Sequence, residues 1–300
     1  MRLDDYRTSD NVGDQRGQSF GGGGGFGGGG GIFGLLFGLV ASRFGIGGII
    51  VLGIGAMLLG FNPLGGGGSG LVSPAPHTQT GGKSAAEACA VDAESRFSCQ
   101  VLASTEDTWT KVFAEQGQRY TPAGFIFYDE RGSSGCGAAQ SAMGPFYCPT
   151  DNRIYLSPSF YGELRNRFGA AGDFAQAYVI AHEVGHHIQR LAGTLDEARA
   201  MQARASAAEG NAVQVRVELQ ADCYAGVWAA RNKDRLEPGD VEEGMRAAEA
   251  IGDDTLQKQT QGRVAPESFT HGTSAQRMAW LRRGLESGDP AQCDSFKGAI

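Results

Sequence analysis

Apolar residues recur at helical spacing from Phe174 to Ile188. Asp173 precedes this run, a glutamine follows three residues later, and Gly193 comes directly after the last turn, a pattern typical of capping at both ends of a helix. The spacing therefore predicts a helix over about residues 174–192.

Similar patterns predict a mainly helical domain over residues 84–300. Strand patterns are fewer: residues 124–128 form one, and residues 145–148 and 153–156 predict a hairpin across a Pro-Thr-Asp-Asn turn. We therefore expect an α+β fold with a small antiparallel sheet. Further helices are predicted over residues 85–117 (interrupted near 96–98), 158–168, 211–231, 240–250 and 273–286.

The first 83 residues have a different pattern. Residues 21–31 are glycine except for Phe26, and residues 62–83 are rich in Gly, Ser and Pro, which is typical of linkers. The uncharged apolar run between them is just long enough to cross a bilayer as one helix. We therefore divide the chain into an N-terminal segment (1–43), a transmembrane helix (44–61), a linker (62–83) and one domain (84–300).

The basic residues predict an orientation for this transmembrane helix. Arg2, Arg7, Arg16 and Arg43 precede the apolar run, and the next basic residue is Lys83. The positive-inside rule then places the N-terminus in the cytoplasm. We expect a single-pass protein of the cell (inner) membrane whose C-terminal domain is periplasmic or extracellular.

The cysteines support the same location. All six follow the apolar run, as expected for a domain that folds in an oxidising compartment. Their spacing does not fix the pairing, and free buried thiols are the alternative. Pairing of neighbours gives Cys89–Cys99 and Cys136–Cys148 and leaves Cys223–Cys293.

The motif His-Glu-x-x-His occupies residues 182–186 of the first predicted helix, and three of the five histidines in the chain fall within residues 182–187. Positions i and i+4 share one face of a helix, so the imidazoles of this motif can bind one Zn²⁺. Glu183 is rotated away from that face and can act on water instead. His187 points about 100° away from His186, so we expect it to pack or to support a ligand.

A catalytic zinc site needs a third protein ligand and an open position for water. Glu218 and Asp222 lie one turn apart on the helix predicted over residues 211–231, among apolar residues where unpaired charge is costly. One can bind the metal while the other accepts the N–H of a ligand histidine. Asp173 and Glu197 are poorer candidates, because they lie about two turns or more from the histidines.

Several segments carry a family resemblance. They are Gly-Pro-Phe-Tyr-Cys-Pro (144–149), His-Glu-Val-Gly-His-His-Ile-Gln (182–189), Glu-Leu-Gln-Ala-Asp-Cys-Tyr-Ala-Gly (218–226) and Thr-His-Gly-Thr-Ser-Ala-Gln-Arg (270–277). Together with the N-terminal Met-Arg-Leu and the Gly-rich segment, they resemble the putative neutral zinc metallopeptidase family of bacterial membrane-anchored proteins.

The resemblance implies a zincin-like fold in which His182, His186 and Glu218 bind one Zn²⁺ and Glu183 is the catalytic base. Asp222 would then support a ligand histidine. One departure is the serine at position 157, where we expect the family often to carry Asp; it falls at the start of a loop and not in the metal site.

These features lead us to expect a membrane-anchored zinc metallopeptidase that hydrolyses peptide or protein substrates. We nominate His271 as a donor to the oxyanion, with a structural capping role as the alternative. Zinc peptidases commonly add an extended substrate to an exposed strand, so we expect Phe146, Tyr147 and Tyr155 to contact the substrate.

Other classes of protein remain open at this point. An inactive zinc-binding regulatory module at the cell envelope would keep the metal ligands, although the intact Glu183 argues against it. An iron oxygenase with two histidines and one carboxylate would share the ligand set. The net charge of −7, without a basic run, argues against a nucleic-acid partner.

Overall fold

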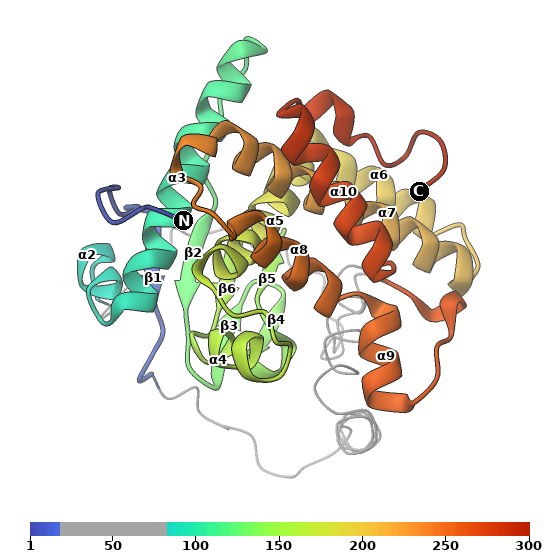
Figure 1. Cartoon of the computed structure of the whole chain (residues 1–300), viewed down its shortest axis with the longest axis horizontal. Helices are drawn as coiled ribbons and strands as arrows, with labels where there is room; N and C mark the ends of the chain where they lie inside the picture. Colours follow the sequence, from blue (N-terminus) through green and yellow to red (C-terminus); the bar gives the residue numbers. More distant parts are fainter. Residues whose placement is uncertain (19–82) are drawn as a thin grey trace, which may run out of the picture.

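The computed structural model describes residues 1–18 and 83–300. In Figure 1 the strands lie toward the left of the molecule, α5 lies near its middle, and α6, α7, α9 and α10 lie on the right. The strands are β1 (Val12–Asp14), β2 (Gly124–Phe127), β3 (Arg131–Ser134), β4 (Gly137–Gln140), β5 (Phe146–Cys148) and β6 (Arg153–Leu156). The α-helices are α2 (Ala85–Cys89), α3 (Ala93–Glu115), α4 (Ser159–Asn166), α5 (Asp173–Ala192), α6 (Thr194–Gln202), α7 (Ala207–Arg231), α8 (Asp240–Ala250), α9 (Asp253–Gln261) and α10 (Ser274–Ser287).

The mainly helical α+β class is confirmed, but the sheet is mixed and not antiparallel. Its strand order is β1-β2-β6-β5, and only the β5–β6 pair is antiparallel. That pair is the predicted hairpin, whose tight turn forces the two strands to reverse. Strands β2 and β6 pair in parallel, and in the chain they are separated by the β3–β4 hairpin and β5. Strands β1 and β2 also pair in parallel.

The helix that carries the His-Glu-x-x-His motif is confirmed with a change at its start. Gly172 is the N-cap, and Asp173 is the first helical residue, not the cap that we predicted. The first long helix is broken earlier than expected, because the side chain of Asp92 caps α3 by accepting a hydrogen bond from the backbone N–H of Ser95. Helices α6 and α9 were not predicted.

All three expected cysteine pairs are joined as disulfides in the structure. Cys89–Cys99 connects α2 to α3, and Cys136–Cys148 connects the loop after β3 to β5. Cys223–Cys293 joins α7 to the C-terminal segment after α10. The third disulfide thereby ties the C-terminal segment to a helix of the domain centre.

Residues 1–18, which we assigned to a separate N-terminal segment, pack on the domain. Strand β1 extends the sheet beside β2, and the side chain of Leu3 is 1% exposed. The amine of Met1 donates to Asp173 Oδ1 at 2.6 Å and Asp240 Oδ1 at 3.0 Å, at the starts of α5 and α8. The predicted span (44–61) lies outside the described residues, and none of the helices in the described part has the length and apolar character needed to cross a bilayer.

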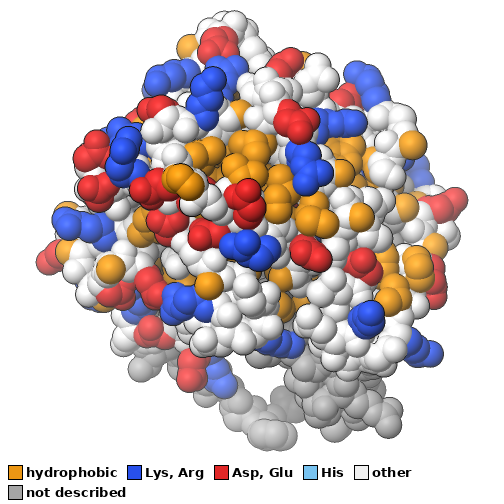
Figure 2. Space-filling model, viewed as in Figure 1, with side chains coloured by type: hydrophobic (Ala, Val, Ile, Leu, Met, Phe, Trp, Pro, Cys, Tyr) orange, Lys and Arg blue, Asp and Glu red, His pale blue; other side chains and the backbone are white. Residues whose placement is uncertain are grey.

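The surface carries charge of both signs. Figure 2 shows acidic and basic side chains interspersed over the face that is viewed as in Figure 1. This mixed distribution agrees with the modest net charge of −7.

Candidate metal centre

The two helices that carry the predicted ligands approach each other closely at Gly185. A Cβ atom placed on this glycine would lie 2.9 Å from the carbonyl oxygen and 3.0 Å from the Cα of Ala221 on α7. A side chain at position 185 would therefore push α5 away from α7. The glycine inside the His-Glu-x-x-His motif lets the backbones pack at the point where the ligands must meet.

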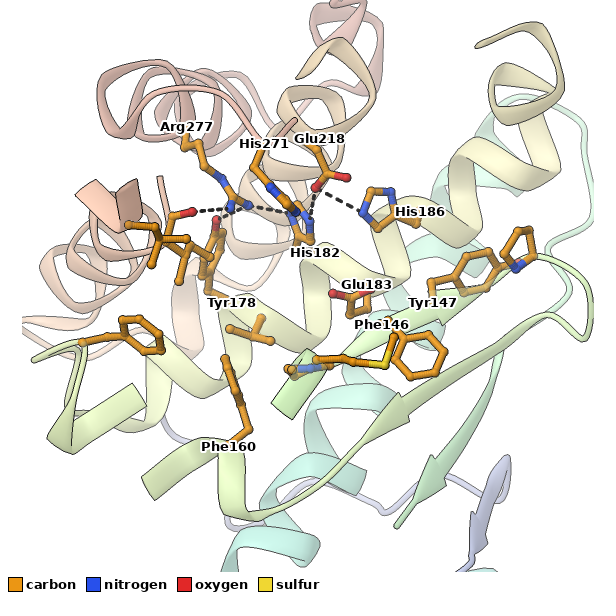
Figure 3. A pocket seen from close by; sticks show the side chains of 18 of the residues that line it. Phe146, Tyr147, Phe160, Tyr178, His182, Glu183, His186, Glu218, His271 and Arg277 are labelled. Carbon is orange, nitrogen blue, oxygen red and sulfur yellow. Dashed lines mark hydrogen bonds and ion pairs between the residues drawn. The ribbon is translucent and has the colours of Figure 1, made fainter. Parts of the chain in front are cut away.

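This approach brings His182, His186 and Glu218 together. One ligand atom from each side chain lies within 4.8 Å of the others, and all three residues are buried. Glu218 Oε2 is 3.2 Å from His182 Nε2 and 3.6 Å from His186 Nε2. Ligands held tetrahedrally at about 2.0–2.1 Å from Zn²⁺ are roughly 3.3 Å apart. The separations of Glu218 Oε2 from the two imidazole nitrogens are therefore close to those that a zinc ion requires (Figure 3).

The other nitrogen of each histidine is held by a neighbour. Asp222 Oδ1 lies 2.8 Å from His182 Nδ1, and Gln189 Oε1 lies 2.8 Å from His186 Nδ1. When each Nδ1–H donates to these oxygens, the lone pair of each Nε2 points toward the metal position. Sequence analysis identified Asp222 in this supporting role, but it missed Gln189.

Asp222 has a second role that the sequence did not indicate. Its carboxylate accepts hydrogen bonds from Arg277 Nε and Nη2, both at 2.8 Å, and from the hydroxyl of Tyr178 at 2.6 Å. Arg277 is 2% exposed and Asp222 is fully buried, so each charge is neutralised by the other inside the protein. This ion pair links α10 to the helix that carries Glu218.

The local charges shift the pKa values of the ligands. Burial would lower the pKa of His182, but the carboxylates of Asp222 and Glu218 outweigh it and raise the pKa to about 9. Burial would raise the pKa of Asp222, but Arg277 and His182 lower it to about 2. The pKa of Glu218 is likewise held well below its usual value, by His186 and His182 against the effect of burial. The charges of the centre thus favour the ionised form of both carboxylates, and a metal that binds His182 would compete with a proton for this side chain.

Glu183 lies in the same cavity as the ligands. It is buried, and burial raises the pKa of its carboxyl group. A carboxylate with a raised pKa beside a metal position is suited to accept a proton. The cavity is lined on its remaining sides by mostly apolar residues, namely Met143, Gly144, Pro145, Phe146, Tyr147, Pro149, Phe160, Phe168, Tyr178, Val179, Leu195, Ile251 and Leu256, together with His271 and Arg277 (Figure 3).

His271 lines this cavity with one ring nitrogen free. Its Nδ1 lies 3.2 Å from Asp253 Oδ1, whereas its buried Nε2 has no hydrogen-bond partner in the described part of the chain. Asp253 Oδ2 accepts the backbone N–H groups of Thr270 and His271 at 2.6 Å each, so it holds both the ring and the loop. Burial would lower the pKa of His271, but Asp253 outweighs it and raises this pKa.

The predicted hairpin lies beside the candidate metal centre, and two of its three residues that we expected to contact the substrate line the cavity. Phe146 and Tyr147 line the cavity, whereas Tyr155 is not among the lining residues. Tyr155 stacks behind Phe146, with 5.1 Å between ring centroids, and its hydroxyl donates to Asp151. Tyr155 is the cross-strand partner of Phe146, so the two side chains lie on the same face of the sheet. Tyr155 therefore supports Phe146 without lining the cavity itself.

His187 is not close to the metal position. Its Nδ1 lies 3.0 Å from the hydroxyl of Tyr147 and its Nε2 lies 2.7 Å from the carbonyl oxygen of Thr121. The prediction of a packing role is therefore confirmed. Asp173, a rejected ligand candidate, contacts the amine of Met1.

The residues that sequence analysis missed are Gln189, Asp253 and Arg277. Gln189 lies three residues after His186 on the same helix face, which is a signal that helical spacing could have given. Asp253 and Arg277 reach the centre from other helices, so no local spacing connects them to it.

Comparisons with known proteins agree with this geometry. The family model described as "Putative neutral zinc metallopeptidase" matches residues 1–296. Uncharacterized protein YpfJ of Escherichia coli (strain K12) is 45% identical over 305 residues, covering 100% of both chains. Uncharacterized protein Rv2575 of Mycobacterium tuberculosis (strain ATCC 25618 / H37Rv) is 39% identical over 265 residues, covering 81% of this chain and 86% of the relative. No solved structure matches. The motif, its metal-ligand geometry and these matches together show that the chain belongs to the putative neutral zinc metallopeptidase family.

Proposed function

We propose that this protein is a zinc-dependent peptidase in which His182, His186 and Glu218 bind the metal and Glu183 is the catalytic base. The observation that carries the proposal is the convergence of the three ligand atoms within 4.8 Å, in a cavity that also holds Glu183. The cavity has an apolar side, so it can also receive a substrate side chain next to the metal position.

Zinc bound there would polarise the scissile carbonyl and make water more acidic. Glu183 would accept the proton of the attacking water and pass it to the leaving nitrogen. Its raised pKa suits this exchange, because a group that takes up and then releases a proton works best when its pKa lies near the working pH.

His271 would stabilise the negative charge that develops on the carbonyl oxygen. Its unpaired Nε2 faces the cavity, and Asp253 favours the protonated ring. A preorganised donor of this type commonly contributes about 10²–10³ in kcat. The expected oxyanion role of His271 thus remains our proposal, now with a residue that orients it.

The substrate would bind as an extended strand along β5. This strand is at one edge of the sheet order β1-β2-β6-β5, and it contributes Phe146 and Tyr147 to the cavity wall. An edge strand offers free backbone groups to a peptide. Phe160, Val179 and Leu256 would surround a substrate side chain, so we expect a preference for large apolar residues at the cleaved bond.

The proposed location is the cell envelope, with the catalytic domain outside the cytoplasm. Three disulfides in one domain fit an oxidising compartment, and the sequence of the apolar run 44–61 would suit contact with the membrane.

The proposal is tested with the purified full chain loaded with zinc. Wild-type protein should cleave an unfolded protein such as reduced casein, and Glu183→Gln should bind one equivalent of zinc without cleaving it. The glutamine variant keeps the size of the side chain and removes only its basicity. Stoichiometric zinc with no cleavage by wild type would instead support the inactive zinc-binding module, and loss of zinc in Glu183→Gln would show that the role given to this residue is wrong.

A further inference from the structure

The N-terminal residues are an integral part of the disulfide-bonded domain. Strand β1 pairs in parallel with β2 along Val12–Phe125, Gly13–Ile126 and Asp14–Phe127. The backbone N–H of Gln15 donates to the carbonyl of Phe127 at 2.7 Å. Strand β1 forms one edge of the sheet and is buried at all three positions, so it is covered by the rest of the domain.

Two of the four arginines that suggested a cytoplasmic N-terminus, Arg7 and Arg16, are bonded to this domain. Arg7 Nη2 lies 2.6 Å from Asp107 and 3.1 Å from Glu106, both on α3. Arg16 pairs with Asp14 at 2.8 Å, and its Nη2 donates to the carbonyl of Ala88 on α2. These contacts hold the N-terminal residues against α2 and α3 of the domain.

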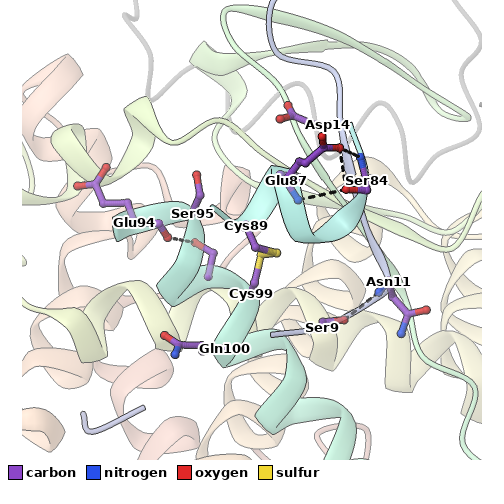
Figure 4. Close-up of a disulfide and its surroundings, with 12 residues drawn as sticks. Ser9, Asn11, Asp14, Ser84, Glu87, Cys89, Glu94, Ser95, Cys99 and Gln100 are labelled. Atoms are coloured by element: carbon purple, nitrogen blue, oxygen red, sulfur yellow. Dashed lines mark hydrogen bonds between the residues drawn. A yellow bond between two sulfur atoms is a disulfide. The ribbon is translucent and has the colours of Figure 1, made fainter. Parts of the chain in front are cut away.

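The contacts lie next to a disulfide. Cys89–Cys99 joins α2 to α3, and the backbone N–H of Ser9 donates to the carbonyl of Cys99 at 3.1 Å (Figure 4). The side chain of Asn11 donates to Glu106 on the same helix at 2.8 Å. A disulfide of this kind forms and persists in an oxidising compartment. Residues packed against it must be present in that compartment when the domain folds.

The two ends of the intervening segment also meet. Lys83, the first described residue after that segment, lies 3.1 Å from the carboxylate of Asp14, which is four residues before Gln18, the last described residue ahead of the segment. The chain therefore leaves the domain and returns to it at the same place. A single membrane crossing between residues 19 and 82 would separate these two ends by the thickness of a bilayer, about 30 Å.

We propose that residues 1–18 and 83–300 lie together on the oxidising side of the membrane. This arrangement replaces the single-pass topology with a cytoplasmic N-terminus that the sequence suggested. The proposal does not depend on the peptidase activity. It rests on the pairing of β1, which lies at the other edge of the sheet from β5, on the ion pairs of Arg7 and on the disulfide Cys89–Cys99.

The test uses two single-cysteine additions to the full chain. Asp10→Cys reports the N-terminal residues and Glu286→Cys reports the domain; both positions are exposed, and neither contributes a side-chain hydrogen bond or ion pair in the described part of the chain. All six native cysteines are in disulfides, so the unmodified chain is the control for background labelling. A membrane-impermeant maleimide is applied to spheroplasts of a Gram-negative host before and after lysis, and the purified variants confirm that each thiol reacts.

We expect both thiols to be labelled before lysis to the same extent. Labelling of Glu286→Cys before lysis and of Asp10→Cys only after it would place the two parts on opposite sides of the membrane and overturn the proposal. Labelling of both thiols only after lysis would overturn the assignment to the oxidising side.

Discussion

Replacement of Asp222 by Ala should weaken zinc binding and also destabilise the metal-free protein. Asp222 accepts hydrogen bonds from Arg277, Tyr178 and His182 at 2.6–2.8 Å and is fully buried. Its removal leaves the guanidinium of Arg277, which is 2% exposed, without its carboxylate. Breaking a buried ion pair in this way typically costs about 3–5 kcal/mol, a large fraction of the roughly 5–15 kcal/mol that stabilises a domain.

The loss of zinc affinity has a different origin. Without Asp222, the Nδ1–H of His182 has no acceptor, so neither the tautomer nor the orientation of the ring is fixed. Loss of such a supporting carboxylate typically weakens metal binding by about 10–100-fold, or about 1.4–2.8 kcal/mol. Glu218→Ala, which removes a ligand, should by contrast abolish stoichiometric zinc binding.

A double variant separates the two effects. Asp222→Ala combined with Arg277→Met removes both buried charges, so most of the lost free energy of unfolding should return while zinc binding stays weak. Stability is measured by urea unfolding in the presence of a chelator, and affinity by competition with a chromophoric chelator. The reasoning is refuted if Asp222→Ala unfolds within about 1 kcal/mol of wild type, or if the double variant recovers wild-type zinc affinity.

Three further changes test other parts of the structure. Gly185→Ala should force α5 from the backbone of α7, costing about 1–3 kcal/mol and weakening zinc binding, whereas Gly210→Ala, whose added Cβ would meet nothing within 4 Å, should leave zinc affinity unchanged in the same titration. Asp253→Asn should lower kcat by up to about 10²-fold with little change in KM in steady-state cleavage assays. An increase in KM with unchanged kcat would contradict a role in orienting the oxyanion donor. Burial would raise the pKa of Asp253, but its histidine partner and backbone N–H groups lower it below the unfolded value. Its contribution to stability is therefore present above about pH 4 and lost as the pH falls through the folded pKa, so urea unfolding of Asp253→Asn should depend less on pH in this range. Replacing Cys223 and Cys293 by Ser should cost about 4 kcal/mol, because the disulfide closes a loop with a sequence separation of 70; an unchanged urea midpoint would be the contrary result.

The sequence alone determined the local part of the metal centre. Two histidines four residues apart on a helix share one face whatever surrounds them, so their arrangement as candidate ligands of one metal could be predicted from spacing. Glu218 and Asp222 followed from the same rule applied to a second helix, together with the family resemblance. The three disulfide pairs were also predicted, and two of them join cysteines that are near neighbours in the chain.

Tertiary packing alone decided what surrounds those residues. Arg277 reaches Asp222 across 55 residues of sequence, and Asp253 reaches His271 from the start of another helix, so no periodic pattern links them. The position of residues 1–18 is the clearest case. Read along the chain, their arginines look like a cytoplasmic signal, because charge counting considers only the order of residues. In the folded protein β1 pairs with a strand about 110 residues away, and Arg7 pairs with two carboxylates of α3 that the local sequence cannot show.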